Sequence, residues 1–374
     1  MFLARAEIRR SRGKFLMLTA AVGLLAFLIL VQQAIAGALV TSFNGAIKNQ
    51  TAPVLVYATD ALRSPQGSII TPDWEELIAD DPSVAATSRI GILATTAEIA
   101  DDGAGVASSG EATVTIWGAE DAALGGPAEP VEGRAVESSG EAVATRGDLA
   151  LGDTVTLSGE EEDLTFTVVG LVQDAQVNVT PTVYVSFEDF EAAQGVLNPF
   201  ARGVLPSMIG VEPAESAEET VAALLEASPA IEPLTREAAA DEFPGVGPVN
   251  TSFLIILGLF GFVVPLVTGL FFLILTFQKS KALTLLRAVG GRASVLGRSL
   301  LIQVVLVLGI GLAVGAALYW VTTLFEIGGL RLEFSWASVG LWAGLLLVLG
   351  VLSALASVRR VLAIEPVEAT KGGH

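Results

Sequence analysis

Residues 251–277 read TSFLIILGLFGFVVPLVTGLFFLILTF, a run of 27 residues without one charged side chain. An α-helix rises 1.5 Å per residue, so about 20 apolar residues cross the hydrocarbon core of a bilayer. Helices of soluble proteins average only about 11 residues, so burial in a soluble core is the weaker interpretation. The run is therefore predicted to be a transmembrane helix.

Three further runs have the same character. They cover residues 15–41, where only Gln32 and Gln33 interrupt the apolar residues, then 299–325 and 335–358. Basic residues precede the first run, so a secretory signal peptide is the alternative there. The apolar part is too long for that, and no clear small-x-small cleavage motif ends it. The sequence predicts four retained spans.

The overall composition combines an apolar and an acidic part. Hydrophobic residues make up 52% and charged residues 16%, the mean hydropathy is +0.63, and the net charge is -19. Soluble chains carry about 25% charged residues. A nucleic-acid partner is excluded because phosphate binding requires clustered Lys and Arg. There is no cysteine, and the only histidine is His374, which excludes disulfides, thiol nucleophiles and His-rich metal sites.

The distribution of basic residues predicts the orientation of the chain. Five bases precede the first span, five lie between the second and third, and three follow the fourth, whereas residues 42–250 hold 7 bases and 35 acids. Loops rich in Lys and Arg stay in the cytoplasm. The predicted order is a cytoplasmic amphipathic helix (1–14), span 1 (15–41), an extracellular domain (42–250), span 2 (251–277), a cytoplasmic loop (278–298), span 3 (299–325), an extracellular turn (326–334), span 4 (335–358) and a cytoplasmic tail (359–374).

The large segment 42–250 is predicted to be an α+β domain. Runs rich in β-branched residues alternate with turn signals, and short amphipathic patterns follow Ser or Thr with early acids. Acidic clusters at 160–163 and 215–219 could suggest calcium, but no EF-hand spacing is present, and solvated turns explain them better. Expected strands are 53–59, 113–117, 153–157, 164–172 and 182–185, the third and fourth forming a hairpin, and expected helices are 72–78, 187–193 and 217–226.

The motifs of several enzyme classes are absent from the sequence. It contains no Gly-x-x-x-x-Gly-Lys-Ser/Thr phosphate loop, no Gly-x-Ser-x-Gly elbow and no His-Glu-x-x-His pair. The four spans carry no charged residue of the kind that marks proton-coupled transporters. We therefore expect no catalytic residue, no metal site and no cofactor in this chain, and any transport it performs would be powered by another subunit.

Three stretches resemble MacB/FtsX-like ABC transporter permeases, which have one span, a large outer domain and three more spans. Residues 146–172 are similar to that family's "L-x-x-G-D-x-V … F-T-V-V-G" element, 281–292 to its "L-R-A-x-G" coupling segment, and 364–369 to its terminal "x-P-x-E-A". Gly291 departs from the usual residue after the coupling motif, and residues 100–140 match no part of the pattern. The resemblance implies a homodimer that works with a dimer of ABC ATPase subunits, which bind ATP and magnesium.

A narrower resemblance points to the HrtB-type haem-export permeases and their DevC-like relatives. It rests on residues 243–245 (FPG) and 271–287 (FFLILTFQKSKALTLLR), which are short and largely apolar. This resemblance implies an HrtA-like ATPase partner and haem as the exported cargo.

The cytoplasmic loop carries the candidate coupling residues. Leu283, Leu286 and Val289 recur at helical spacing and Gly290 ends the pattern, as a left-handed cap requires. A short amphipathic helix of this kind fits a groove in a partner protein. The alternative is an interfacial helix whose Arg287 faces lipid headgroups. With the family pattern, these five residues are predicted to contact the ATPase, and residues 2–14 are predicted to lie on membrane lipid.

Small residues in the spans offer close helix packing. Gly311 and Gly315 form one GxxxG pair and Gly340 and Gly344 another, while Gly258, Gly261 and Pro265 weaken the second span. Packing within the chain and packing against a second copy are equal alternatives for these pairs.

A candidate ligand site lies at the outer end of the third span. Haem iron is bound by His, Cys, Met or Tyr, and Tyr319 is the best placed of these, since Met17 and Met208 lie elsewhere. Glu326 and Glu333 follow it, and Arg331 could pair with a propionate. The simpler interpretation is an aromatic belt with surface charges. Haem itself enters only through the resemblance.

The sequence therefore indicates an ABC permease that exports an apolar cargo, with haem first and a lipid, lipoprotein, peptide or drug second. Two alternatives come from other classes. An FtsX-like protein would relay the ATPase state to an external cell-wall hydrolase, and a membrane-tethered receptor would need no ATPase at all.

Overall fold

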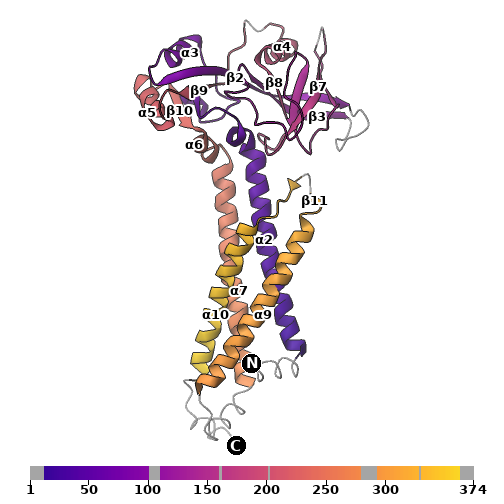
Figure 1. Cartoon of the computed structure of the whole chain (residues 1–374), viewed down its shortest axis with the longest axis vertical. Helices are drawn as coiled ribbons and strands as arrows, with labels where there is room; N and C mark the ends of the chain where they lie inside the picture. Colours follow the sequence, from indigo (N-terminus) through magenta and orange to yellow (C-terminus); the bar gives the residue numbers. More distant parts are fainter. Residues whose placement is uncertain are drawn as a thin grey trace, which may run out of the picture. The chain divides into compact units, whose positions relative to one another are not determined.

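The computed structural model describes residues 12–100, 110–159, 162–200, 203–278, 293–327 and 330–362. The chain divides into two compact units. One contains residues 1–38 and 251–374 and is built from long helices, and the other contains residues 39–250 and holds the sheet (Figure 1).

Four helices are long and apolar enough to cross a membrane. Their bounds are α2 (Arg12–Asn49), α7 (Val246–Gln278), α9 (Ala293–Thr322) and α10 (Trp336–Leu362). Helix α2 continues eight residues beyond the end of the predicted first span at residue 41. Those last turns belong to the unit with the sheet, where tertiary contacts rather than lipid hold them.

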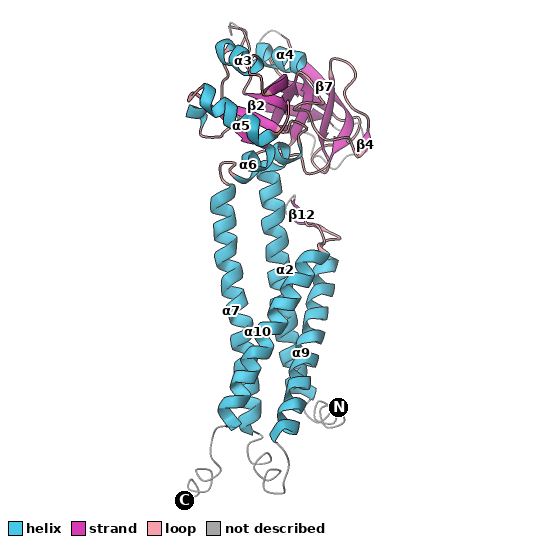
Figure 2. Ribbon diagram, turned by 60° about the vertical axis from the view of Figure 1, so that its left-hand side comes forward, coloured by secondary structure: helices cyan, strands magenta, loops and turns pink. Residues whose placement is uncertain are grey.

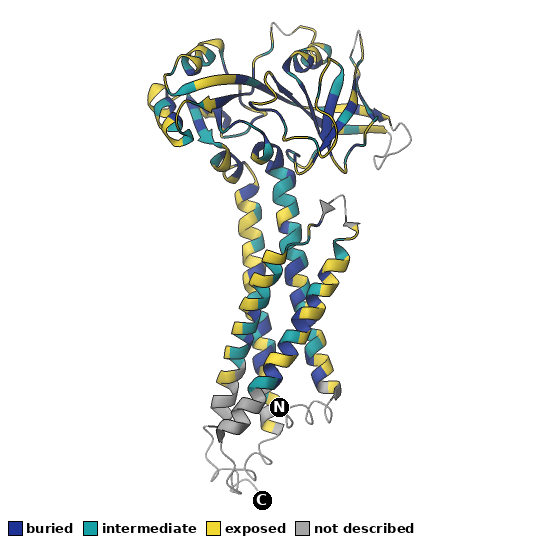
Figure 3. Ribbon diagram, viewed as in Figure 1, coloured by how far each residue is buried: buried dark blue, intermediate teal, exposed yellow. Residues whose placement is uncertain are grey.

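The four helices bury small apolar clusters against one another. One cluster joins Phe15, Leu18 and Val22 of α2 to Val304, Val307 and Leu308 of α9. A second joins Ile29 of α2 to Leu257 and Val264 of α7, Leu312 of α9 and Leu346 of α10. Large side chains such as those of Leu254, Leu259 and Leu341 are exposed, as expected for helices surrounded by lipid. Figure 3 shows exposed positions along the long helices.

The two GxxxG pairs lie in different surroundings. A Cβ atom on Gly311 would lie 2.8 Å from a methyl group of Val22, and one on Gly315 would lie 2.9 Å from the Cβ of Ala26. These glycines therefore let α9 approach α2 within one chain. A Cβ added to Gly340 or Gly344 would meet nothing within 4 Å among the described residues.

The other unit is α+β, as the sequence predicts, and its strands form one continuous sheet of ten strands (Figure 2). Its helical elements are η1 (Thr59–Ala61), α3 (Pro72–Ala79), α4 (Phe187–Leu197), α5 (Ala217–Ala227) and α6 (Arg236–Asp241). Its strands are β1 (Val54–Ala58), β2 (Val84–Ala100), β3 (Gly110–Ala119), β4 (Glu132–Gly133), β5 (Glu141–Thr145), β6 (Thr154–Leu157), β7 (Leu164–Val172), β8 (Thr182–Ser186), β9 (Met208–Pro213) and β10 (Ile231–Thr235).

Half of this sheet has a ferredoxin-like topology. The spatial order β10-β1-β9-β2 with antiparallel neighbours follows from a β1-α3-β2 … β9-α5-β10 path. Successive side chains of a strand point to opposite faces, and β1 shows this plainly. Val54 and Val56 pack with α3 and α5, whereas Leu55 and Tyr57 pack on the other face with the ends of α2 and α7.

The other half closes into a barrel. Pairings run β2–β3–β8–β5–β7–β6 and return from β6 to β2, so every strand of this ring has two neighbours. The interior is filled by apolar side chains, among them Ile116, Phe166 and Val183. Phe190 of α4 is fully buried in the same cluster, so α4 closes this core.

The predicted strands and helices of this unit all occur, including the β6–β7 hairpin. The sequence analysis did not identify β2, β4, β5, β9, β10, η1 and α6. The long strand β2 contains five alanines and no continuous β-branched run, so local propensity does not reveal it. Its length is set by its partners, because β3, β6 and β9 all pair with it.

Candidate functional site

Two of the four predicted ligand residues, Glu326 and Arg331, lie on a short hairpin that follows α9. Strands β11 (Glu326–Ile327) and β12 (Leu330–Arg331) are antiparallel, and their register places Glu326 opposite Arg331. The structure describes only the backbone of these two residues. Residues directly opposite each other on paired strands are close enough for oppositely charged side chains to interact, so this register permits an ion pair between Glu326 and Arg331.

Tyr319 lies near the end of α9 and is almost fully buried. Its hydroxyl donates a hydrogen bond of 2.6 Å to the backbone carbonyl of Glu333. Its ring stacks on Phe334 at a centroid distance of 5.1 Å, and Phe334 meets Trp336 edge-on at 4.9 Å. The hydroxyl of Tyr319 thus fixes the segment that leads into α10, and iron ligation by it would require that this bond breaks.

Tyr319→Phe should lower the free energy of unfolding by about 1 kcal/mol, since it removes one buried hydrogen bond and leaves the Glu333 carbonyl without this donor. Chemical unfolding of the full chain in detergent measures this. Trp320→Phe is the control, because Trp320 is exposed and should change stability little. Equal stability of Tyr319→Phe and the parent protein would contradict this role.

The two methionines named as familiar haem ligands lie in different surroundings. Met17 is 73% exposed on α2, whereas Met208 is fully buried in β9 within the core of the sheet. Met208 is therefore a core residue. Among the described residues, no group of three His, Cys, Asp or Glu side chains is arranged to hold a metal ion.

The candidate coupling residues lie outside the described residues. Residues 279–292 are not described, and they include Leu283, Leu286, Arg287, Val289 and Gly290. Their role stays a prediction. The same holds for most of the predicted amphipathic segment 1–14 and of the tail 359–374.

The sequence analysis did not predict one buried part of the sheet unit, which we call the joint and which is formed by residues 42–49, 173–181 and 239–246. The chain enters the sheet unit through the end of α2 and leaves it through the start of α7, and both segments belong to the joint. In this unit, Ile47 near the end of α2 belongs to one buried cluster with Ala240 of α6, Phe243 and Val246 at the start of α7. The Asn44 side chain donates from Nδ2 to the carbonyl of Ala240 at 2.7 Å. This buried contact ties residues 196 positions apart in the chain, so no local pattern could reveal it.

The loop between β7 and β8 reinforces the joint. Its backbone N–H groups donate to carbonyls of α2, from Asn178 to Phe43 at 3.0 Å and from Val179 to Ser42 at 2.8 Å. A Cβ atom on Gly45 would lie 2.9 Å from the carbonyl carbon of Asp174, so only glycine permits this approach. The last turns of α2 are therefore held as part of the sheet unit.

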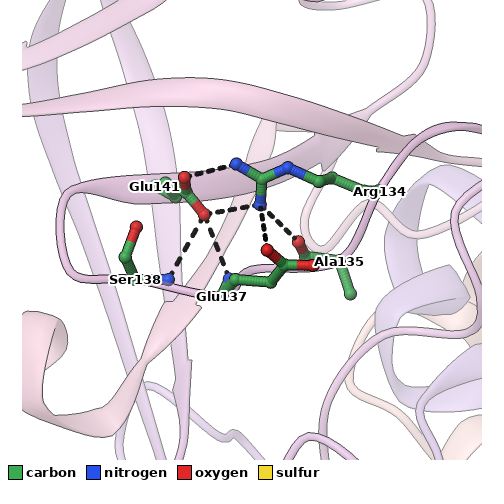
Figure 4. A network of polar contacts seen from close by, with 5 residues as sticks. All are labelled: Arg134, Ala135, Glu137, Ser138 and Glu141. Atoms are coloured by element: carbon green, nitrogen blue, oxygen red, sulfur yellow. Dashed lines mark hydrogen bonds and ion pairs between the residues drawn. The ribbon is translucent and has the colours of Figure 1, made fainter.

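A surface network fixes the turn between β4 and β5 (Figure 4). Arg134 contacts Glu141 through both terminal nitrogens, at 2.7 and 2.5 Å, and the backbone N–H groups of Glu137 and Ser138 donate to the same carboxylate. These hydrogen bonds, first of all those from Arg134, hold the pKa of Glu141 well below its ordinary value of 4.5. The network supports the barrel rim and shows no feature of a ligand site.

The depressed pKa of Glu141 predicts a pH dependence. The unfolded state takes up the proton near pH 4.5 while the folded state stays ionised, so the contribution is full above that pH and is lost as pH falls below it. Glu141→Gln should therefore flatten the decline of stability between pH 5 and about pH 3. Arg134→Gln should flatten the decline of stability equally, because both variants remove the same interaction between Arg134 and Glu141. An unchanged pH profile in either variant, measured by urea unfolding, would contradict this assignment.

The fold and the apolar helices define a class of protein. Four helices able to span a membrane accompany an α+β unit placed between the first and second of them, as in a multi-pass membrane protein with one extracellular domain. Residues 15–227 match the family of MacB-like periplasmic core domains. This chain belongs to that family.

Two known proteins are similar to the chain. A hemin transport system permease protein named HrtB, from Staphylococcus haemolyticus (strain JCSC1435), is 23% identical over 232 residues. That match covers 61% of this chain and 61% of the relative, so the chain spans about three fifths of the length of the relative. The extracellular domain of the noncanonic ABC-type transporter YknZ from Gram-positive bacteria is 13% identical, with a TM-score of 0.32, and the match covers 49% of this chain and 99% of that one.

Proposed function

We propose that this chain is the permease subunit of an ABC efflux transporter, driven by a separate ATPase dimer and working as a homodimer. The family match over residues 15–227 carries the proposal, and the similarity to a permease of a hemin transport system supports it. Both termini and the 278–298 loop face the cytoplasm in this proposal, because their basic residues favour that side.

In this proposal, ATP hydrolysis on the cytoplasmic side supplies the energy for transport. The chain has no phosphate loop, so ATP and magnesium bind to the partner subunit. The helix predicted at 281–291 sits in a groove of that ATPase, with Leu283, Leu286 and Val289 as its apolar contacts. Nucleotide-driven motion of the partner then moves the helix together with α7 and α9, which flank it in the sequence.

The joint supports a mechanical role for the outer domain. Helices α2 and α7 each run without interruption from an apolar span into the sheet unit, and the joint holds their ends in one core. In this proposal, rocking of the spans is passed along the chain to the outer domain, which helps to release cargo on the outer side.

Haem is the proposed cargo, and the hemin transport relative is its support. Arg331, on the hairpin that follows α9, is the proposed cationic partner for a propionate, and Glu326 and Glu333 complete the proposed site. The geometry of Tyr319 favours a structural role over iron ligation, so in this proposal haem is held by Arg331 and apolar surface.

Cells that lack this chain should become at least tenfold more sensitive to hemin, and the parent protein should restore tolerance while Arg331→Glu should not. Arg331→Lys is the matched control, since it keeps the positive charge. A Soret band shift on hemin titration of the purified chain measures binding directly.

Unchanged hemin tolerance together with no Soret shift would reject haem as the cargo. If the ATPase still copurified with the chain in that case, the FtsX-like role as a regulator of an external hydrolase, or export of another apolar cargo, would take its place. If no ATPase copurified, the permease itself would be rejected in favour of a membrane-tethered receptor.

A further inference from the structure

Two loops of the sheet unit hold exposed apolar side chains in a strained backbone conformation. Leu62 and Arg63, just after η1, have φ angles of 51° and 66°, and Asn178 and Val179, between β7 and β8, have φ angles of 53° and 61°. This left-handed region is unfavourable for residues with a Cβ atom, and a β-branched valine is a true outlier there. Leu62 is 79% exposed and Val179 is 44% exposed, so core packing does not explain them. Backbone strain of this kind is typical of functional positions.

The two loops are bonded to each other and to the joint. The side chain of Asn178 donates from Nδ2 to Oε1 of Gln66 at 2.7 Å. Arg63 contacts Glu232 of β10 at 2.7 Å through Nε, and a terminal nitrogen of its guanidinium pairs with Glu242. Glu242 belongs to the joint, as does the loop that carries Asn178. Both loops therefore lie where the chain enters and leaves the sheet unit.

The contact with α2 relates these loops to the surface of the bilayer. The backbone N–H of Val179 donates to the carbonyl of Ser42 at 2.8 Å, and α2 is one continuous helix through this point. The predicted first span, residues 15–41, has a helical length of about 40 Å, which is close to the thickness of about 40–45 Å of a bilayer with its headgroups. Ser42 is therefore expected at the outer headgroup layer, and the loop bonded to it is expected at the same level.

We propose that Leu62 and Val179 insert into the headgroup layer of the outer leaflet, so that the sheet unit contacts lipid through these two loops. Both side chains are aliphatic, and burial of aliphatic surface is what binds such residues to an interface. Two carboxylates already pair with Arg63, and Asp60 and Asp174 are exposed in the same loops. The contact is therefore apolar and suits a zwitterionic lipid such as phosphatidylcholine rather than an anionic one. The proposal depends on neither the cargo nor the ATPase.

Single cysteines test this contact in the full chain, reconstituted into phosphatidylcholine vesicles, because the chain has no cysteine of its own. Leu62→Cys and Val179→Cys carry a fluorophore, and the vesicles contain lipid with a quenching spin label on the headgroup. Leu225→Cys is the matched control, since Leu225 is 52% exposed and its helix α5 packs on the face of the sheet opposite to the joint. Quenching should be at least twofold stronger at positions 62 and 179 than at position 225. Partial replacement of phosphatidylcholine by phosphatidylglycerol should not increase it.

Equal quenching at positions 62, 179 and 225 would overturn the proposal. Disulfide-linked dimers of Leu62→Cys without quenching by lipid would also overturn it, and would assign the loops to contact with a second copy of the chain.

A measurement without labels separates a role in lipid contact from a role in folding. Asparagine tolerates the left-handed region, so Leu62→Asn and Val179→Asn should keep or raise the thermal midpoint of the full chain in detergent. Ile70→Asn is the control, because Ile70 is fully buried in the core beside the first loop, and its replacement should lower the midpoint. A midpoint lowered as far by Leu62→Asn and Val179→Asn as by Ile70→Asn would show that these side chains stabilise the sheet unit itself, and would contradict the proposal.

Discussion

Gly118→Val should prevent the extracytoplasmic unit from folding, while Gly195→Ala, a glycine change on the neighbouring helix α4, should be neutral or slightly stabilising. Gly118 of β3 and Gly91 of β2 are paired on adjacent strands of the barrel, and the side chain of Phe190 packs on both. A Cβ on Gly118 would lie 2.8 Å from Cγ of Phe190, while one on Gly195 would meet nothing within 4 Å among the described residues.

The expected size follows from which atoms collide. At Gly118 the clash involves atoms at the base of the Phe190 side chain, so helix α4 must move. That movement would expose Phe190, whose burial stabilises the unit by about 3–5 kcal/mol. At Gly91 the clash involves the ring, at 2.5 Å from Cδ1, and ring rotation relieves part of it. Gly118→Ala should therefore cost about 3 kcal/mol and Gly91→Ala less.

Limited proteolysis of the full chain in detergent would measure this series, since the barrel resists cleavage only while folded. The order of resistance should be parent and Gly195→Ala first, Gly91→Ala next and Gly118→Val last. A Gly118→Val variant as resistant as the parent protein would show that α4 does not close the barrel core through Phe190.

Leu286→Asp should abolish copurification of the ATPase and, with it, any transport activity. The prediction places Leu286 at the centre of the apolar stripe that enters the partner, and a buried unpaired carboxylate there costs several kcal/mol. The control Thr284→Asp adds the same charge about 160° away around the helix, and it should keep the partner bound. Both variants should fold, because the outer domain and the spans are unaffected.

Retention of the ATPase by Leu286→Asp, with Thr284→Asp behaving identically, would mean that this loop only lies on lipid. A titration with vesicles of anionic lipid would then be expected to bind both variants less tightly than the parent protein.

The sequence was most informative where one local property decides the structure. The four uncharged runs and the β-branched segments 53–59 and 164–172 were predicted from length and composition, and the structure has helices and strands there. The closed barrel could not be predicted in this way, because the pairing of Ile99 with Val155 joins residues 56 positions apart. The extension of α2 was missed for the same reason, since contacts with Ala240 and Asn178 hold it.

The candidate site shows a different limit. Tyr319 was selected because a phenol can bind iron, yet its hydroxyl donates to the Glu333 carbonyl. The sequence shows which ligands a side chain is able to bind, but the fold determines which backbone group lies next to it and takes its hydrogen bond.

The central claim is that one domain of about 200 residues lies outside the membrane while the coupling segment lies in the cytoplasm. The chain has no cysteine, so single cysteines can be introduced without background. The variants Glu226→Cys, on the exposed surface of α5, and Arg287→Cys should be compared in intact cells with a membrane-impermeant maleimide. The account predicts labelling at position 226 in intact cells and at position 287 only after permeabilisation. Labelling of both positions in intact cells, or of neither, would contradict it.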